Sequence, residues 1–339
     1  MSEGFGETAP PTARRPVSLA LQGGGSWGAY TWGVLDALLA TRGAAHARRK
    51  LRSFWMTVAS PDVYCGSMFC PATLRWREAL GAWLMCNLLA SPYSTNPLGN
   101  NLLRAAIEAH VDVDAIRHRS APSLYVTLTN VRTGLPRVIG NDAMTIDALV
   151  ASCSLPQLFP AVEIDGEDYW DGGYAGNPTL WPLIHSGMAD DLVLVQLSPT
   201  EVSDLPKDAA SIRRRVLEIV FNSSLVAEMQ AIMAMRSLKD NADRIRGADL
   251  RIHRIGPPKP ELLERGSALE RSPSWLEEVF DAGRADARRF LERNGADIGV
   301  RDTLDLAKSF ADTRKPKLRV AANEETFAPL RNLSDGVCS

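Results

Sequence analysis

A short apolar run that breaks into three consecutive glycines constrains this chain more than any other feature. Residues 17–22 have the composition of a buried strand, and Gly23, Gly24 and Gly25 follow it directly. A helical pattern over residues 28–40 begins almost at once. A strand, a glycine turn and a helix N-terminus aim backbone N–H groups at a negative charge, and glycine leaves room for a ligand and permits positive φ. The turn therefore predicts an anion or oxyanion site.

The composition is that of an ordinary globular protein and argues against several classes. The 339 residues are 45% apolar and carry a net charge of −2. Without a basic stripe they do not suggest nucleic-acid binding. No apolar run reaches the roughly 18–20 residues of a membrane span, so at most peripheral membrane contact is expected. Five irregularly spaced cysteines indicate reduced thiols in a cytoplasmic protein. We expect neither a metal site nor a cofactor.

Apolar periodicity predicts an α/β protein with three layers, in which helices cover both faces of a mostly parallel central sheet. Residues 1–15 are expected to form a disordered leader, 16–255 the α/β domain, 256–313 a helical C-terminal extension and 314–339 a flexible tail. The expected strands are 17–22, 123–130, 137–140, a hairpin over 161–170, 191–198 and 250–255. The expected helices are 28–40, 44–58, 72–89, 102–110, 146–153, 209–241, 275–294 and 302–310.

The glycine turn matches two sequence motifs literally. Gly23, Gly25 and Gly28 fit the dinucleotide fingerprint, while Gly24, Ser26 and Gly28 fit the G-x-S-x-G nucleophile elbow. A dinucleotide site also needs a strand ending in an acidic residue about 20 residues later, where this chain has a basic helix. An elbow at Ser26 needs an oxyanion hole from a second glycine-rich segment. A third interpretation makes the turn itself the oxyanion hole, with its backbone amides as donors.

Asp171 is predicted to supply the second half of such a site. It stands in the stretch Asp-Tyr-Trp-Asp-Gly-Gly-Tyr over residues 168–174, which closes the expected hairpin. A tight turn through Gly172 and Gly173 lets the carboxylate project into a cleft, although a plain Asp-Gly turn is the commoner source of this pair. Apolar and aromatic neighbours favour burial. Asp171 is therefore the predicted catalytic base, facing the glycine turn across a common pocket.

These segments together resemble the bacterial patatin-like phospholipases. The resemblance runs from about Val17 to Ile255 and depends on the glycine turn, on Ser-Leu-Pro-Gln-Leu-Phe-Pro at 154–160 and on Tyr-Trp-Asp-Gly-Gly-Tyr-Ala-Gly-Asn-Pro at 169–178. It implies a lipid acyl hydrolase with a serine–aspartate dyad that acts on a lipid or acyl ester. The residues that match the family motifs are Gly23, Gly24, Gly25 and Gly28 for the oxyanion hole, and Asp171, Gly172 and Gly173 for the base motif.

The nucleophile segment of that family is missing from this sequence. The family carries its serine in a G-x-S-x-G elbow on the strand after the first helix, whereas here the first helix leads through residues 41–46 into the next one. We interpret this as an internal deletion, which leaves Ser26 as a weak candidate nucleophile. The other candidates lack an elbow pattern: Ser60, Ser67, Ser154, Cys65 and Cys70. We therefore expect hydrolysis to be lost or very weak, and the sheet to lack a central strand and to be marginally stable.

Two further hypotheses stand beside a weakened hydrolase. A non-catalytic lipid- or protein-binding module would keep the fold and its anion pocket without the chemistry. Met229, Met233 and Met235 on the expected long helix would then line an acyl groove, although methionines at this spacing are more often part of a core. The chain is alternatively the product of a damaged gene. No motif specifies an oligomeric state.

Overall fold

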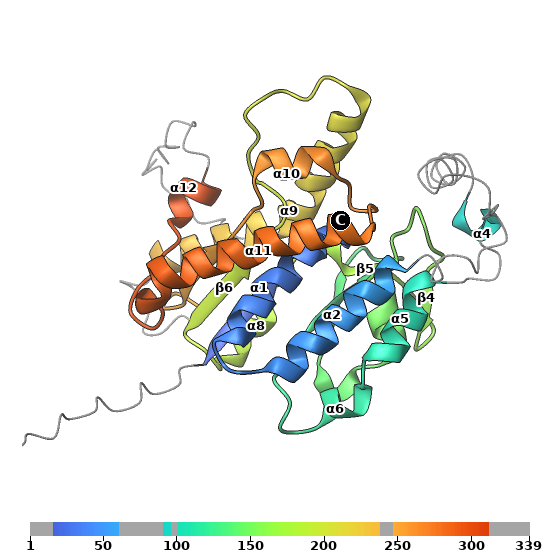
Figure 1. The fold of residues 1–339 in the computed structure, drawn as a ribbon, viewed down its shortest axis with the longest axis horizontal. Helices are drawn as coiled ribbons and strands as arrows, with labels where there is room; N and C mark the ends of the chain where they lie inside the picture. The colour runs from blue at the N-terminus through green and yellow to red at the C-terminus, as the bar shows by residue number, and fades with distance from the viewer. Residues whose placement is uncertain (1–15, 61–90, 96–100, 238–246, 312–339) are drawn as a thin grey trace, which may run out of the picture.

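The computed structural model of the protein describes residues 16–60, 91–95, 101–237 and 247–311 (Figure 1). The expected leader, the expected tail and the expected helix 72–89 lie outside these residues, as do Ser67, Cys65 and Cys70. The described part is an α/β protein, as the sequence predicts.

A parallel three-stranded sheet with the order β1–β6–β7 lies at the centre. The strands are β1 (Val17–Leu21), β6 (Asp191–Val195) and β7 (Arg251–Ile255). β1 and β7 each pair with β6 along their whole length. All residues of β6 are buried. This is typical of a parallel strand that is covered on both faces, and it explains why its sequence is uniformly apolar after Asp191.

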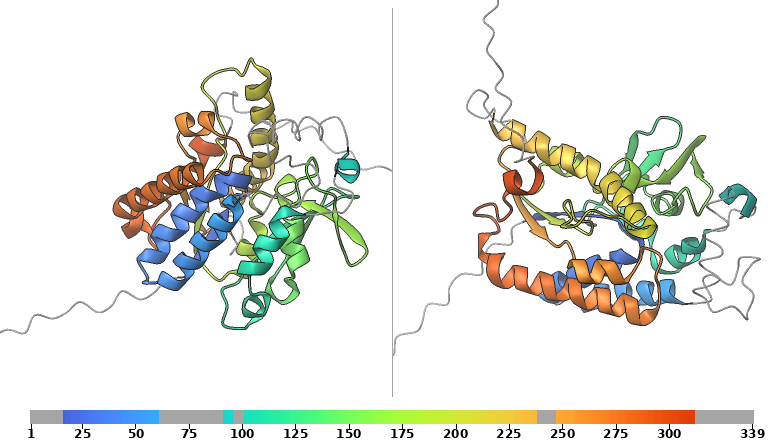
Figure 2. Two further views of the ribbon diagram at one scale, coloured as in Figure 1. Left: turned by 45° about the vertical axis from the view of Figure 1, so that its right-hand side comes forward. Right: turned by 90° about the horizontal axis from the view of Figure 1, so that it is seen from above.

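Alternate residues of β6 contribute to two different cores, because successive side chains of a strand point to opposite faces. Val193 and Val195 pack against α1 (Gly28–Ala40) and α11 (Pro273–Asn294). The even-numbered ones pack against α9 (Ala209–Ser237), α8 (Trp181–Ser186) and α12 (Leu306–Phe310). The view from above in Figure 2 shows the sheet between α9 on one side and α1 and α11 on the other.

α11 lies in backbone contact with α1, so the C-terminal extension shares the core of the α/β domain. An added Cβ at Gly33 of α1 would stand 2.0 Å from the carbonyl oxygen of Phe280. An added Cβ at Gly283 of α11 would stand 2.0 Å from the carbonyl oxygen of Tyr30. The two glycines let the helices approach each other more closely than any side chain permits.

A buried charged cluster at the start of β6 also fixes the extension to the sheet. Asp191 accepts hydrogen bonds from Arg251 at 3.0 and 2.8 Å and from the Gly299 N–H at 2.7 Å. It also bonds to Nε2 of the fully buried His253 at 3.0 Å, whose Nδ1 lies 2.9 Å from Thr303 Oγ1. Burial acts to raise the pKa of Asp191, but the bonds from Arg251, Gly299 and His253 outweigh it and lower the pKa to about 2. The carboxylate therefore stays ionised and holds residue 299 against the sheet.

α9 is long and apolar enough, by length and composition, to cross a membrane, with a mean hydropathy of 1.3 over its best window. The sequence analysis expected no such segment. One face of α9 belongs to the core of the protein, since Leu225, Met229 and Ile232 are fully buried. Met233 and Met235 pack against the same core. The three methionines thus pack in the core cluster on this side of the sheet, as methionines at this spacing usually do.

The other strands form a separate four-stranded antiparallel sheet, where the sequence predicted one mostly parallel sheet. Its order is β3–β2–β5–β4, and α7 (Ile146–Ala151) covers one face. The predicted hairpin is confirmed, with its turn at Asp165 and Gly166, both at positive φ. The strands are β2 (Val126–Asn130), β3 (Pro136–Ile139), β4 (Val162–Ile164) and β5 (Glu167–Asp171).

α1 leads directly into α2 (Ala45–Ala59) through residues 41–44, without a strand between the two helices. In the described part of the chain, β1 pairs with β6 alone, and no strand pairing joins the two sheets. Leu19 and Leu21 of β1 are consequently 36% and 37% exposed. The remaining helices of the described ranges are α4 (Pro92–Thr95), α5 (Leu102–His110), α6 (Val113–Arg117) and α10 (Pro260–Arg265).

Candidate functional site

The glycine turn contacts the segment that follows Asp171. The Gly23 N–H donates to Asn177 Oδ1 at 2.7 Å, and Asn177 Nδ2 donates back to the Gly23 carbonyl at 3.2 Å. Asn177 belongs to the same segment, residues 169–178, as the predicted base motif at Asp171. The structure therefore brings together the two segments that the sequence predicted to share a site, through a residue that the sequence analysis did not single out.

Gln22 connects the end of β1 to three other elements. Its buried amide donates to the Asn177 carbonyl at 3.0 Å and to Asn222 Oδ1 of α9 at 2.9 Å. Its carbonyl oxygen accepts from the N–H groups of Leu197 and Ser198, just after β6. The Gln22 side chain thus donates two hydrogen bonds and accepts two, which satisfies its amide group. The sequence pattern that could have indicated this network is a glutamine at the end of an apolar strand, because a buried amide needs hydrogen-bond partners.

The backbone N–H groups of two of the four predicted oxyanion-hole glycines are already hydrogen-bonded within the protein. The N–H of Gly23 is used by Asn177, and that of Gly28 bonds to the carbonyls of Gly25 and Ser26. An added Cβ at Gly28 would stand 3.0 Å from the ring of Trp55 in α2, so this glycine serves helix packing. Within the described residues, the N–H groups of Gly24 and Gly25 have no hydrogen-bond acceptor. These two amides are the candidates for binding a negative charge.

Backbone conformation and close packing within the protein explain why residue 25 is a glycine. It has φ +59, and a Cβ there would stand 2.4 Å from the carbonyl oxygen of Ala268. The same carbonyl accepts the Ser26 N–H at 2.7 Å. Residues between α10 and α11 thus lie directly against the turn. The sequence analysis predicted glycine here for ligand room and for positive φ, and at Gly25 the structure shows positive φ together with the close Ala268 carbonyl.

Asp171 ends β5 and directs its carboxylate into a buried setting. Oδ1 accepts the N–H of Gly173 at 2.7 Å, and no side-chain hydroxyl or thiol of the described residues donates to this carboxylate. Burial raises the pKa of Asp171 to about 6, and the bond from Gly173 only partly opposes this. A carboxylate with such a pKa is ionised at neutral pH and still able to accept a proton, as a general base must be.

Hydrogen bonds to Ser154 and Thr129 fix the backbone of Asp171. Its N–H donates to the Ser154 carbonyl at 2.9 Å, and its carbonyl accepts from Thr129 Oγ1 at 2.7 Å. Ser154 is completely buried and its hydroxyl is bonded to Val150 and Asn101. The Ser-Leu-Pro-Gln-Leu-Phe-Pro stretch therefore positions the hairpin. Its serine is fully engaged in this structural role.

The two glycines after Asp171 are required by close packing. A Cβ at Gly172 would stand 1.9 Å from the carbonyl oxygen of Thr127 in β2. A Cβ at Gly173 would stand 2.6 Å from the ring of Phe221 in α9. The turn η4 (Gly172–Tyr174) is thus enclosed between β2 and α9, and this enclosure contributes to the burial of the carboxylate.

Neither Ser26 nor Cys153 has the properties of an activated nucleophile. Ser26 is buried in the turn η1 (Gly25–Trp27) and has no hydrogen bond to Asp171. Cys153, which the sequence analysis overlooked, lies close enough to sense the Asp171 charge. Burial first, and that charge second, raise the pKa of its thiol to about 11. A thiol with this pKa is protonated at neutral pH and is therefore a weak nucleophile.

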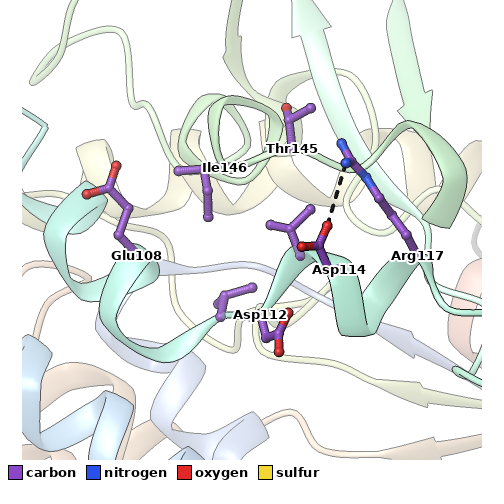
Figure 3. Close-up of a pocket in the computed structure, with 8 residues that line it drawn as sticks. Glu108, Asp112, Asp114, Arg117, Thr145 and Ile146 are labelled. Carbon is purple, nitrogen blue, oxygen red and sulfur yellow. Dashed lines mark ion pairs between the residues drawn. The ribbon is translucent and has the colours of Figure 1, made fainter.

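A surface pocket lies elsewhere, between α5, α6 and the start of α7 (Figure 3). Its acidic lining includes Glu108, Asp112 and Asp114, and Asp114 forms a 4.0 Å ion pair with Arg117. None of the predicted site residues lines this pocket. Among the residues that the structure describes, no three or more His, Cys, Asp or Glu side chains gather in a way that would hold a metal ion.

Comparison with known protein families supports the resemblance. Residues 45–184 match the patatin-like phospholipase family. The matched range includes α2, the second sheet and the Asp171 motif, and it begins just after the 41–44 connection, so the glycine turn lies outside it. No curated protein matches the chain. The resemblance predicted from the sequence is therefore confirmed over a narrower range than Val17 to Ile255.

Proposed function

From the patatin-like phospholipase match of residues 45–184, we propose that this chain derives from a lipid acyl hydrolase and has lost most or all of its hydrolytic activity. The family supplies the reaction class, which is acyl-ester hydrolysis.

The observation that carries the proposal is the direct passage from α1 to α2. Residues 41–44 are too few to hold a strand, an elbow and a further helix, because even a crossover between parallel strands takes about a dozen residues. A hydrolase of this type forms an acyl-enzyme, which requires a hydroxyl or thiol beside the base. The only hydrogen bond to the Asp171 carboxylate from described residues comes from a backbone N–H.

The parts that remain suit the binding of an acyl ester better than its cleavage. The Gly24 and Gly25 amides are available to an anionic or carbonyl oxygen, and Asp171 lies beside the Asn177 segment that contacts their turn. Oxyanion-hole donors contribute about 3 kcal/mol each to the transition state, but without a nucleophile this stabilisation serves no covalent step. A non-catalytic lipid-binding role on the same fold is the second candidate.

Ester hydrolysis by the purified full chain tests the proposal. We expect p-nitrophenyl butyrate and phosphatidylcholine to be turned over no faster by the natural chain than by Asp171→Asn, because the base has nothing to activate. General-base catalysis contributes roughly 10²–10⁴-fold. Turnover about 10²-fold above that of Asp171→Asn would overturn the loss of activity.

Two further variants identify the nucleophile if such turnover is found. Loss of turnover in Ser26→Ala would assign it to the literal G-x-S-x-G match. Loss in Cys153→Ala would assign it to the thiol beside Asp171. Retention in both would point to a nucleophile other than Ser26 and Cys153.

A further inference from the structure

The first turns of α9 and the loop before it expose an apolar surface that the core does not use. These residues extend beyond α10 at the top of Figure 1. Leu205 is 79% exposed, and Val216 and Ile219 are each 53% exposed. We call this surface the α9 patch. Its members are Val202, Leu205, Ile212, Val216, Leu217 and Ile219.

The patch includes a stripe along one side of the helix. Ile212, Val216 and Ile219 are spaced by four and three residues, so they share one face. The fully buried Leu225 lies on a different side of the helix and packs into the core. α9 is thus apolar on its outer side as well as its inner side. A surface helix of a soluble protein normally has a polar outer face, so this pattern needs an apolar partner.

The patch adjoins the candidate site. Phe221 follows Ile219 by two residues, and its ring packs against Gly173 and lies 5.2 Å from the ring of Tyr174. Asn222 accepts the hydrogen bond from Gln22 at the base of the glycine turn. The helical part of the patch therefore ends, at Ile219, within one helical turn of the α9 residues that contact both halves of the site.

We propose that the α9 patch docks on the surface of a lipid bilayer. The inference rests on the proposed function in one respect, namely that the ligand of the site is a lipid or acyl ester. An apolar stripe on a helix that lies in the plane of the bilayer enters the boundary between head groups and acyl chains. Since α9 also borders the Asp171 turn through Phe221, docking would bring the bilayer surface near the candidate site.

The charges around the stripe fit this position. Arg213 is exposed and has no acidic partner among the described residues, while Arg214 and Arg215 share the buried Glu218. Guanidinium groups beside an inserted stripe lie at the depth of lipid phosphates. The preceding loop carries Glu201, Asp204 and Asp208 against Lys207, so the segment as a whole is nearly neutral. Binding therefore depends on apolar insertion more than on attraction to an anionic surface.

Co-sedimentation of the full chain with phosphatidylcholine vesicles, with and without phosphatidylglycerol, tests the proposal. We expect the natural chain to bind both, and Val216→Asp/Ile219→Asp to bind at least about tenfold more weakly, since each apolar side chain contributes to transfer from water. Leu135→Asp/Val300→Asp is the matched control, because these side chains are 64% and 68% exposed on other elements. Surface substitutions of this kind change stability little, and thermal unfolding checks that all variants fold.

Three outcomes overturn the proposal: no vesicle binding by the natural chain, equal loss in the control variant, or a dimer in solution that only the patch variant dissociates. The last would assign the patch to a second copy of the chain. The readout does not involve hydrolysis. Vesicle binding with no ester turnover supports docking and the loss of activity together, whereas turnover of soluble p-nitrophenyl butyrate without vesicle binding contradicts both.

Discussion

Asp171 binds its proton more tightly in the folded protein than in the unfolded chain. Burial raises its pKa from 3.8 to about 6. Between about pH 4 and pH 6 the unfolded chain has lost this proton and the folded protein has kept it. The contribution of this group to the free energy of unfolding is therefore full below pH 4, falls as the pH rises through this window and stays low above it.

Replacing Asp171 by asparagine removes this ionisation. We expect Asp171→Asn to be more stable than the natural chain at pH 7.5, by on the order of 1–3 kcal/mol, because a pKa unit corresponds to about 1.4 kcal/mol. The gain should disappear below pH 4, where both side chains are neutral. Urea unfolding across this pH range measures it. A stability difference that is the same at pH 3.5 and pH 7.5 would show that the burial of the charge has no energetic effect.

At the scale of elements, the contact of α1 with α11 depends on two glycines inside helices. We expect Gly33→Ala to lower the free energy of unfolding by about 2–4 kcal/mol, because the methyl group would stand 2.0 Å from the Phe280 carbonyl and force the helices apart. Gly295→Ala is the control. Gly295 follows α11 with helical φ and ψ and has open space around it, so alanine there should be neutral or slightly stabilising.

Thermal or urea unfolding of both variants measures the difference. Equal effects of the two alanines would mean that the close contact with α11 does not require glycine at position 33, since alanine is the better helix former.

The elements with strong periodicity were predictable from the sequence, and their partners were not. β6, α1, α11 and the Asp165–Gly166 hairpin follow from apolar spacing and turn residues. The division into two sheets did not follow, because strand pairing depends on contacts distant in sequence. At the site, the Asp-Gly-Gly motif indicated Asp171. The structure adds Asn177 and Gln22, which connect the two halves through side-chain amides whose partners no local pattern identifies.

At the scale of the whole molecule, the described strands form two sheets with no pairing between them, and one edge of β1 faces no described strand. The Gln22 N–H donates to Val195, so the alternate amides of Leu19 and Leu21 point to the other edge. Proteins usually protect such edges with lysine, proline or a bulge, and β1 contains none of these. An unprotected apolar edge both lowers the cooperativity of unfolding and favours association between chains.

We therefore expect thermal unfolding of the full chain below about 60 °C, accompanied by aggregation, because the loss of strand pairing removes a share of a stability that is typically only 5–15 kcal/mol. Leu19→Lys adds a charge to the exposed edge of β1 and should slow the rise of light scattering on heating. Leu135→Lys, at an exposed loop position, should leave it unchanged. A sharp transition well above 60 °C without scattering would show that the edge is covered in the native protein. Equal slowing by both lysines would assign the effect to net charge and not to β1.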